Sequence, residues 1–506
     1  MAAQNPNPVT NIGHRLSALD ATLLYGESNT SPIHAGMLSF FEGEIPFERL
    51  LKHIEQRLFL LPRFRQRLAP VPLNLAHASF EDDPAFKIEN HVKLHELPPG
   101  TSEVEIIQAA LRIFEPPLSR SKPLWEIHAF TGLESRTCLL WKIHHCLIEG
   151  VSPVEAISAL FDLRADAPAP EPPAQPWTPP PLPGLAETLL TAVHDLLEEQ
   201  FDTAFRAQEL LSSPKELAER TGMLGDAAQS LSRLLAQPIA AAPWNAGLVS
   251  QRRNLIWSRY PFADFRAIRN ALGGTVNDVV LAMVGEAAAR YLAQHDYKPG
   301  GLPLRIGCPV NVPYEDEGGG RGNRVSMVFS ELPATPMNPV ARLEAVSQES
   351  ERAKSSREAQ SLELLTEAIS LIPPGLIGVT SRLTNVGLEV AGTLSRLTSA
   401  LPSCASLGIP AFGLNFTATN TPGVQVPQYM AGHLQLDVVS LTPLAGRLGY
   451  GVSILGYNQN LYFGMIAEPR LMPDPETMKS CLDEVFEELR QAAKTKSPQA
   501  DATPLS

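Results

Sequence analysis

Two adjacent histidines open a short segment that follows an apolar run and ends in a glycine: His144-His145-Cys146-Leu147-Ile148-Glu149-Gly150. A neutral imidazole at a cleft can accept the proton of an alcohol while the alcohol oxygen attacks a thioester carbonyl, because its unperturbed pKa of ~6.5 suits neutral pH. Such a general base contributes roughly a hundred- to ten-thousand-fold to a rate. The alcohol must be held against both the base and the carbonyl carbon before the proton moves, so no covalent enzyme intermediate is required. One histidine of this pair is therefore a candidate general base for acyl transfer.

The backbone around the pair limits what the two rings can do together. Successive residues of a strand point to opposite faces, so His144 and His145 cannot both bind one metal ion from an extended segment, and no metal site is predicted. Glu149 follows His145 by four residues, a spacing that would suit a helix, but Gly150 and the helix-cap residues after it predict a tight loop instead. In that loop the Glu149 carboxylate can fold back and fix the chain.

Acyl transfer also needs a group that stabilises the oxyanion of the tetrahedral intermediate, with donors aimed at it in a dry site. Backbone amides or an asparagine side chain would serve, and Asn277 is the candidate in this chain. Asn277 and Asp278 also stand at the start of an apolar helical pattern, where both residue types commonly cap a helix. The two roles are compatible, and the sequence leaves both open.

Simpler interpretations compete with these assignments. A histidine pair at a strand end, seen alone, is more often structural than catalytic. Cys146 beside His145 suggests a thiol nucleophile, but sequence neighbours rarely reach the geometry of a Cys–His pair, and a small buried residue is the simpler prediction. The glycine-rich residues 318–323 lack the preceding strand and following helix that a phosphate-binding loop needs, which favours a flexible loop.

Hydrophobic periodicity predicts the elements that position the histidines. Residues 124–130 and 137–143 predict two neighbouring strands joined by a turn at 132–135, and the histidine pair lies where the second strand ends. Residues 151–161 predict a helix after the loop. The same half contains a further predicted strand and a predicted helix, at residues 35–41 and 47–58.

Nine prolines between Ala165 and Gly184 exclude helix and central strand and predict an extended linker. Apolar residues at every fourth position over 185–205 then predict an amphipathic helix. In the second half we expect strands at 254–259, 304–312, 324–332, 413–419, 433–440, 450–455 and 461–466, the last six in one sheet, and helices at 262–272, 276–292, between 340 and 397, and at 478–489. The predicted organisation is an N-terminal domain (1–164), a linker with connecting helices (165–235), a C-terminal domain (236–494) and a flexible tail (495–506).

The length and composition are typical of two soluble domains. A chain of 506 residues exceeds what one core usually supports, and 44% hydrophobic with 19% charged residues excludes a disordered chain. A net charge of -13 argues against nucleic acid as the main partner. Five scattered cysteines without zinc or redox spacing imply a reducing compartment. The first ten residues show no secretory signal, and the apolar residues 369–379 are too few to cross a bilayer, so we expect a cytoplasmic protein.

The sequence resembles the bacterial wax ester synthase/diacylglycerol acyltransferase family, whose signature is HHxxxDG and whose fold is similar to that of chloramphenicol acetyltransferase. The resemblance extends over most of the chain in the family's order. Beyond the histidine segment, its first blocks are Leu16-Ser17-Ala18-Leu19-Asp20-Ala21, His34, Pro62-Arg63-Phe64-Arg65-Gln66-Arg67-Leu68, His91 and Pro123-Leu124-Trp125. Its later blocks are Thr275-Val276-Asn277-Asp278-Val279-Val280, Gly322-Asn323, Leu332-Pro333 and Asn420-Thr421-Pro422-Gly423.

The resemblance implies two chloramphenicol-acetyltransferase-like α/β domains, with mixed sheets flanked by helices and a tunnel between them that runs past His145. It implies that His145 is the proton acceptor and that His144 supports the site. Long-chain acyl-CoA, a substrate and not a cofactor, would enter from one side, and a fatty alcohol or diacylglycerol from the other, giving wax ester or triacylglycerol and free CoA. Candidate tunnel residues are Pro123, Leu124, Trp125, Gly322 and Asn323.

The sequence departs from the family at the acidic position of the signature, where Glu149 stands in place of an aspartate whose part is understood as structural. One extra methylene shifts a contact by about a bond length, and misplacement by about 1 Å can cost on the order of a hundredfold in rate. Ser119 also stands where the family has aspartate. Two alternatives stay open: a noncatalytic lipid-binding or regulatory homologue, and an acyltransferase for a different alcohol.

An enzyme that makes hydrophobic esters must release them into lipid. The apolar residues 362–401 have a helical spacing that usually indicates core, and an exposed apolar face there would suit docking on a membrane or lipid droplet. Peripheral lipid contact is therefore a hypothesis. Chain length and the choice of acceptor depend on pocket residues far apart in the sequence, which a single sequence does not identify.

Overall fold

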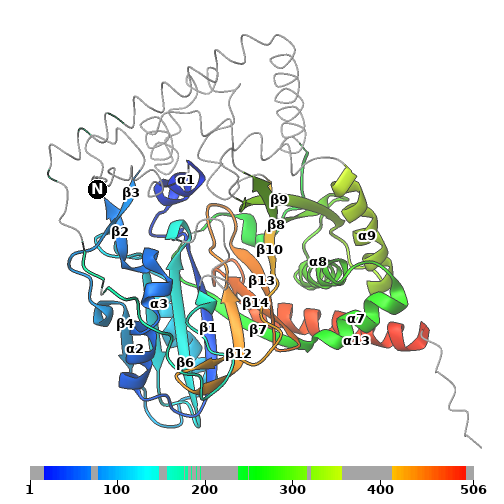
Figure 1. Cartoon of the computed structure of the whole chain (residues 1–506). Helices are drawn as coiled ribbons and strands as arrows, with labels where there is room; N and C mark the ends of the chain where they lie inside the picture. The colour runs from blue at the N-terminus through cyan, green and yellow to red at the C-terminus, as the bar shows by residue number, and fades with distance from the viewer. Residues whose placement is uncertain are drawn as a thin grey trace, which may run out of the picture.

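The structure of the chain is a computed structural model that describes residues 16, 18–69, 78–147, 157–175, 177–179, 184, 190, 194, 237–248, 250–315, 321–355 and 413–496. In that part, two six-stranded sheets lie side by side (Figure 1). The first sheet lies on the left of the view with β1 and β6, and the second lies to its right, beside α8 and α9. Each sheet contains both parallel and antiparallel strand pairs. The predicted α/β class with two mixed sheets is therefore confirmed.

The first sheet carries the histidine pair. Its strand order is β11-β12-β1-β6-β5-β4, with the strands β1 (His34–Glu42), β4 (Val92–His95), β5 (Trp125–Phe130), β6 (Arg136–His144), β11 (Tyr429–Met430) and β12 (His433–Leu441). β1 is antiparallel to β6 over its whole length, from His34 opposite His144 to Glu42 opposite Arg136. The predicted strands at 35–41, 124–130 and 137–143 are confirmed, and β6 ends at the histidine pair as predicted.

Different helices cover the two faces of the first sheet, because side chains alternate along each strand. Met37 of β1 belongs to a hydrophobic core that includes α2 (Phe47–Glu55). Leu38, one residue later, belongs to a second core that includes α3 (Glu103–Phe114). β1 therefore lies between two cores, which explains why every residue of the strand except Glu42 is buried.

Two helices of the first half were not predicted, α1 (Ala18–Gly26) and α3. A start signal for α3 is nevertheless present in the sequence. The Ser102 hydroxyl accepts a hydrogen bond from the Glu105 backbone N–H, and the Glu105 carboxylate accepts one from the Ser102 N–H. This reciprocal cap satisfies two N–H groups that a helix start otherwise leaves unpaired.

The prediction that residues 433–440 share a sheet with the other strands of the second half was wrong. These residues form β12, which pairs antiparallel with β1 of the first sheet, Gly36 opposite Leu441. Alternating apolar residues identify a strand but not its partner, which explains the error. β11 and β12 thus tie the second half of the chain to the first sheet. Domain boundaries at residues 164 and 236 remain a prediction.

The second sheet has the order β7-β14-β13-β10-β8-β9, with β7 (Asn254–Pro261), β8 (Pro303–Glu315), β9 (Arg321–Pro333), β10 (Phe416–Thr421), β13 (Tyr450–Tyr457) and β14 (Asn460–Ala467). Its helices are α7 (Phe262–Leu272), α8 (Val276–Gln294), α9 (Pro339–Ser355) and α13 (Pro475–Lys496). The predicted helices at 262–272, 276–292 and 478–489 are confirmed. A flexible loop over 318–323 was predicted, but β9 already begins at Arg321 and pairs with the end of β8.

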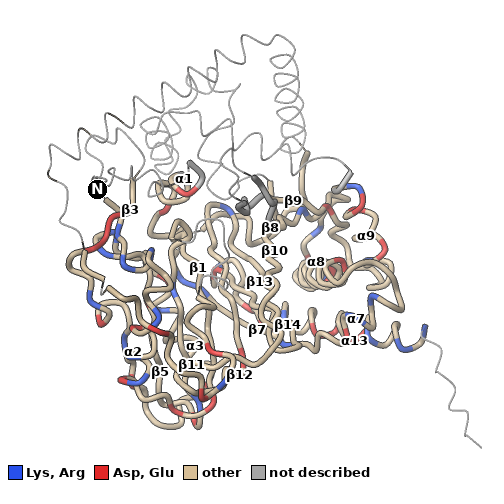
Figure 2. The backbone as a smooth tube through the Cα atoms, viewed as in Figure 1, with Lys and Arg blue, Asp and Glu red and all other residues tan. Residues whose placement is uncertain are grey.

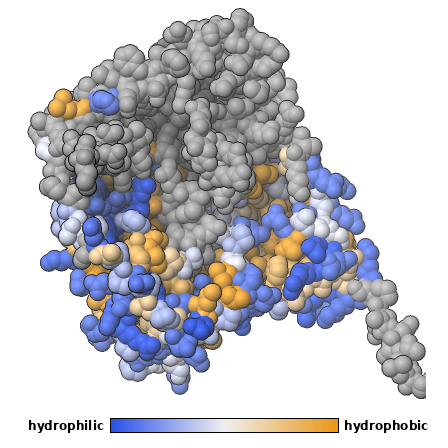
Figure 3. Space-filling model, viewed as in Figure 1, coloured by the Kyte–Doolittle hydropathy of each residue, from blue (hydrophilic) through white to orange (hydrophobic). Residues whose placement is uncertain are grey.

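The described surface is mixed in charge and polarity. Acidic and basic side chains are interspersed over the described chain (Figure 2). Apolar and polar residues are likewise interspersed on the face that Figure 3 shows. Of the helices that the structure describes, none has the length and apolarity needed to cross a bilayer.

Candidate active site

β6 brings His144 and His145 to one end of the first sheet, beside the start of β1. The backbone N–H of His144 donates to the carbonyl of Leu124 across 2.9 Å, and that of His145 donates to the carbonyl of Ile33 across 3.1 Å. The chain then tightens into the 3-10 turn η6 (His145–Leu147). His144 is therefore the last residue of a strand, whereas His145 begins a turn.

The ring of His145 suits a proton acceptor. His144 is fully buried, whereas His145 as a whole residue is partly exposed. Burial, and then the neighbouring His144, lower the pKa of His145 to about 4. The imidazole is therefore neutral at pH 7, because burial disfavours its charged form. Among the described residues, no other residue hydrogen-bonds to this ring.

The ring of His144 is held on both sides. Its Nδ1 atom accepts a hydrogen bond from the backbone N–H of Cys146 at 3.2 Å and lies 2.9 Å from the Cys146 Sγ atom. Its Nε2 atom lies 3.5 Å from Oε1 of Glu27. Burial raises the pKa of the Cys146 thiol well above its ordinary value, so the thiol stays protonated. Cys146 is thus a small buried residue, as predicted.

A third histidine lies opposite the pair. His34 of β1 is the register partner of His144 and is fully buried. One ring nitrogen, Nε2, is hydrogen-bonded to the carbonyl of Phe114 at 2.6 Å, and the Phe114 ring meets the imidazole edge-on at 4.5 Å. Burial and the nearby Lys142 lower the pKa of His34 well below its usual value. His34 therefore contributes a neutral, buried ring that ties β1 to α3.

The segment Pro123-Leu124-Trp125 supports the strand that ends at the histidines. All three residues are buried, and the Leu124 carbonyl accepts the hydrogen bond from the His144 N–H. The Trp125 indole donates from Nε1 to the Phe64 carbonyl at 2.7 Å and stacks on His91 at 4.6 Å. These contacts anchor the backbone beside His144. Their part in lining a tunnel stays a prediction.

Asn277 and Asp278 stand at the start of α8 and have different contacts. Asp278 is buried and forms a reciprocal cap with Thr275, and its carboxylate also accepts a hydrogen bond from Ser350 at 2.7 Å. Asn277 is exposed, and its Oδ1 accepts from Nδ2 of Asn420 at 3.0 Å. Asp278 thus acts in helix capping. The Asn277 amide contacts the late Asn-x-Pro-Gly turn, and its role as an oxyanion donor stays a prediction.

Four predicted site residues receive no side-chain description. Glu149 and Gly150 lie outside the described residues. Gly322 and Asn323 lie in β9, opposite Tyr314 and Pro313 of β8. The structure describes their backbone but not their side chains. The strand begins one residue before Gly322, although the sequence predicted that this pair precedes the strand.

Sequence reasoning missed two charged residues that complete the surroundings of His144, Glu27 and Arg120. The Arg120 Nη2 atom lies 3.1 Å from Oε2 of Glu27. Glu27 directly follows α1, which the sequence analysis did not predict, and no short motif marks it. Arg120 directly follows Ser119, which stands where the family has aspartate. That departure was the only feature of this segment that the sequence singled out. Nothing in the spacing of these two residues indicated that they meet.

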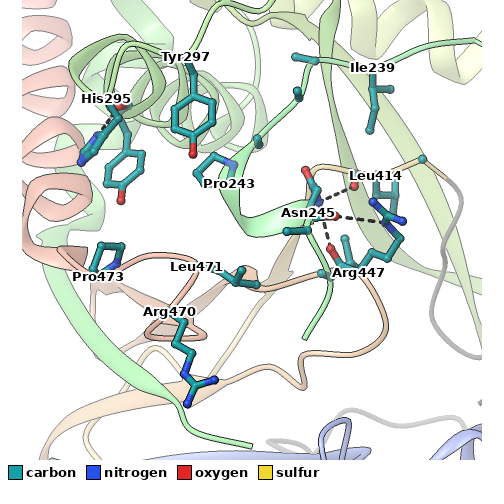
Figure 4. A pocket seen from close by; sticks show the side chains of 17 residues that line it. Ile239, Pro243, Asn245, His295, Tyr297, Leu414, Arg447, Arg470, Leu471 and Pro473 are labelled. Carbon is teal, nitrogen blue, oxygen red and sulfur yellow. Dashed lines mark hydrogen bonds between the residues drawn. The ribbon is translucent and has the colours of Figure 1, made fainter. Parts of the chain in front are cut away.

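A large cavity lies elsewhere, in the second half of the chain (Figure 4). It measures about 910 Å³ and is lined by apolar residues such as Leu414 and Leu471, with Arg447 and Arg470 among its polar residues. A much smaller cavity lies between Met37 of the first sheet and Leu455 of the second. None of the predicted site residues lines either of these two cavities.

Comparison with known proteins matches two family descriptions. Residues 16–280 match the wax ester synthase/diacylglycerol acyltransferase catalytic domain, and residues 321–490 match the WS/DGAT C-terminal domain. A Mycobacterium tuberculosis protein named "Putative diacyglycerol O-acyltransferase" is 27% identical over 491 residues, which cover 93% of this chain and 90% of that protein.

Solved structures show the same fold. The wax ester synthase/diacylglycerol acyltransferase of Marinobacter aquaeolei VT8 is similar with a TM-score of 0.62 and 20% identity, over 95% of this chain and 100% of that one. The first condensation domain of the calcium-dependent antibiotic synthetase is similar with a TM-score of 0.55 and 13% identity, over 95% and 96% of the two chains. The predicted fold is therefore confirmed.

Proposed function

Because the chain belongs to the wax ester synthase/diacylglycerol acyltransferase family, we propose that it transfers a long-chain acyl group from acyl-CoA to a fatty alcohol or to diacylglycerol, with His145 as general base. The observation that carries this proposal is the imidazole of His145, which is neutral at pH 7, belongs to a partly exposed residue and hydrogen-bonds to no other described residue. A buried histidine and a buried carboxylate hold the turn from which this ring projects.

In the proposed reaction, the acceptor hydroxyl lies between the His145 ring and the carbonyl carbon of the thioester. The oxygen forms its bond to that carbon while its proton passes to the imidazole, and the tetrahedral intermediate then collapses with loss of the C–S bond. The CoA thiolate leaves and takes the proton from the imidazolium, so the histidine returns to its neutral form. With a pKa of about 4, His145 is a weak base, and proton transfer must accompany attack because neither the free alkoxide nor a long-lived imidazolium is accessible.

The acceptor and the acyl donor are proposed to meet between the two sheets. The small cavity between the sheets is lined from both by apolar residues, among them Met37, Val438 and Leu455, although none of the predicted site residues lines it. Apolar walls suit alkyl chains, because each Å² of apolar surface removed from water contributes about 25 cal/mol of favourable free energy. An amide at Asn277 is the proposed oxyanion donor. Its Oδ1 is already an acceptor for Asn420, which leaves its N–H groups for other partners.

Thiol release from palmitoyl-CoA in the presence of hexadecanol or a diacylglycerol tests the proposal. We expect turnover by the wild-type chain, its loss in His145→Ala, and equal or higher turnover in Glu149→Asp. His433→Ala is the matched control, because His433 contacts Glu42 at the opposite end of the first sheet. The control is expected to keep wild-type turnover.

Two outcomes would select the alternatives. Turnover with neither acceptor in the wild type or in Glu149→Asp would support a noncatalytic lipid-binding homologue, which the glutamate in place of the signature aspartate makes a specific candidate. Turnover with other alcohols, but not with these two acceptors, would assign a different acceptor class.

Peripheral lipid contact is part of the proposal. Residues 356–412, which include the whole apolar segment proposed for this contact, lie outside the described residues. Flotation of the purified protein with neutral-lipid or anionic vesicles measures the contact directly. Absence of the protein from the vesicle fraction would remove lipid docking from the proposed function.

A further inference from the structure

We propose that Glu27 is a positioning residue of the active site, which fixes the ring of His144 and, through the backbone of Ile33, the backbone of His145. This inference rests on the proposed function, since it assigns a support to the proposed base. Glu27 follows α1 directly, and its side chain is only 4% exposed. Its carboxylate is therefore held inside the molecule next to the end of β6.

The hydrogen bonds of His144 determine which nitrogen carries its proton. The backbone N–H of Cys146 donates to Nδ1 at 3.2 Å, so Nδ1 must present its lone pair. In the neutral ring the proton then lies on Nε2. This atom is buried, makes no hydrogen bond to any described residue, and lies 3.5 Å from Oε1 of Glu27. The Glu27 carboxylate lies within ion-pair distance of this nitrogen, and we infer that its charge keeps the ring in one orientation.

One residue, Ile33, connects the same carboxylate to the proposed base. The N–H of Ile33 donates to Oε1 of Glu27 at 3.1 Å. The carbonyl of Ile33 accepts the hydrogen bond from the His145 N–H at 3.1 Å. A displacement of Glu27 would therefore move the backbone of Ile33 and, with it, the backbone of His145.

Glu27 is itself anchored from two directions. Its Oε2 atom lies 3.1 Å from Nη2 of Arg120, and the same Nη2 also donates to the Leu24 carbonyl at 2.6 Å. Burial alone would raise the pKa of Glu27, but the contacts with His144, Ile33 and Arg120 outweigh it and lower the pKa. The side chain is therefore ionised at neutral pH. Leu24 belongs to the same hydrophobic core as Cys146, so α1 is packed against the turn that it supports.

An amide cannot replace this carboxylate without conflict. Oε1 faces the donors of Ile33 and His144, and Oε2 faces the donor of Arg120. In Glu27→Gln, one of these positions becomes an NH₂ group that points at another donor, whichever way the amide is turned. Glu27→Asp keeps both oxygens but is one methylene shorter. The glutamine variant should therefore disturb the histidines more than the aspartate variant.

The first test is steady-state kinetics of the full chain with palmitoyl-CoA and hexadecanol. We expect kcat of Glu27→Gln to fall about ten- to a hundredfold, as displacement of a reacting group by about 1 Å can cause, with KM changed by less than about threefold. Glu27→Asp should retain more kcat than Glu27→Gln. The matched control is Glu126→Gln, which removes another glutamate–histidine contact of the same sheet, to His128 at 3.2 Å, and should leave kcat unchanged.

The second test does not depend on turnover and so separates this inference from the proposed function. In protein labelled with ¹⁵N-histidine, the His144 resonances, assigned with a His144→Gln variant, should show a proton on Nε2 and none on Nδ1. Glu27→Gln should shift or remove the Nε2–H signal, whereas Glu126→Gln should not. Identical His144 resonances in wild type and Glu27→Gln would overturn the inference, as would an unchanged kcat in an active, folded Glu27→Gln enzyme.

Discussion

Histidine and carboxylate meet in both halves of this molecule, with opposite consequences. At the end of β6, His144 faces Glu27, and the adjacent ring of His145 stays neutral and without a hydrogen bond to other described residues. At the end of α8, both ring nitrogens of His295 are engaged, Nδ1 by a backbone carbonyl and Nε2 by Asp474, each at 2.8 Å. The first arrangement leaves a ring nitrogen available for a substrate, and the second leaves none.

The pKa values follow the same division. Burial lowers the pKa of His145. For His295, burial also acts to lower the pKa, but the Tyr291 carbonyl and Asp474 outweigh it and raise the pKa above its usual value. His295 nevertheless lines the cavity of about 910 Å³, and His145 does not. A large cavity beside a histidine–carboxylate pair is thus not sufficient for base catalysis, because the base also needs an uncommitted nitrogen.

Removal of the two rings should give the largest difference between the halves. His145→Ala should lower kcat by roughly a hundred- to ten-thousand-fold, which is the usual contribution of a general base. His295→Ala should leave kcat within about twofold, since that ring only ties α8 to the start of α13. Thiol release with purified, folded variants measures both values. Equal losses of kcat in the two variants would contradict the assignment of His145, and not His295, as the general base.

Each half also contains a buried tryptophan, so the two halves can be compared by the effect of its removal on stability. Trp125 lies beside the histidine strand, and Trp244 lies in the core of the second half against Tyr291, Phe416 and Tyr450. Substitution of either by alanine should lower the free energy of unfolding by about 3–5 kcal/mol, because each leaves a large cavity. Activity per folded molecule should fall only in Trp125→Ala. Denaturant unfolding, followed by assays on the folded fraction, tests both expectations.

The smallest expected effect concerns the pH dependence of stability. Because the pKa of His295 is raised in the folded state, its contact with Asp474 stabilises the fold below the unfolded pKa of ~6.5, and this stability is lost as pH rises through the folded pKa. The contribution should be at most about 1 kcal/mol, since both side chains are partly exposed. His295→Gln should lower the melting temperature more at pH 6 than at pH 8. An equal change at both pH values would contradict this assignment.

The sequence indicated the elements of the fold better than their partners. Hydrophobic periodicity identified β1, β5, β6, α7 and α8, because each has a strong local pattern. It placed β12 in the wrong sheet, since a strand crosses to another sheet without any local signal. It missed α3 despite the Ser102 and Glu105 cap, which a search for capping residues would have found.

The site divides in the same way. The position of His144 and His145 at the end of a strand followed from local sequence, and the structure places them there. Their different surroundings did not follow. Glu27 reaches His144 only because α1 and β1 fold across the end of β6, and that contact depends on tertiary structure. Residues that support a base from a distant part of the chain therefore need coordinates to be found.

The pH dependence of kcat/KM for palmitoyl-CoA, measured with the acceptor well below saturation, tests the central claim most directly, because its acid limb reports the pKa of the essential base in the free enzyme. A neutral His145 with a pKa of about 4 predicts activity that is level from pH 7 to about 5 and falls as the pH approaches 4. Circular dichroism at each pH confirms that the chain stays folded over this range. An acid limb near the ordinary histidine value of ~6.5, in a protein that is still folded, would contradict the account.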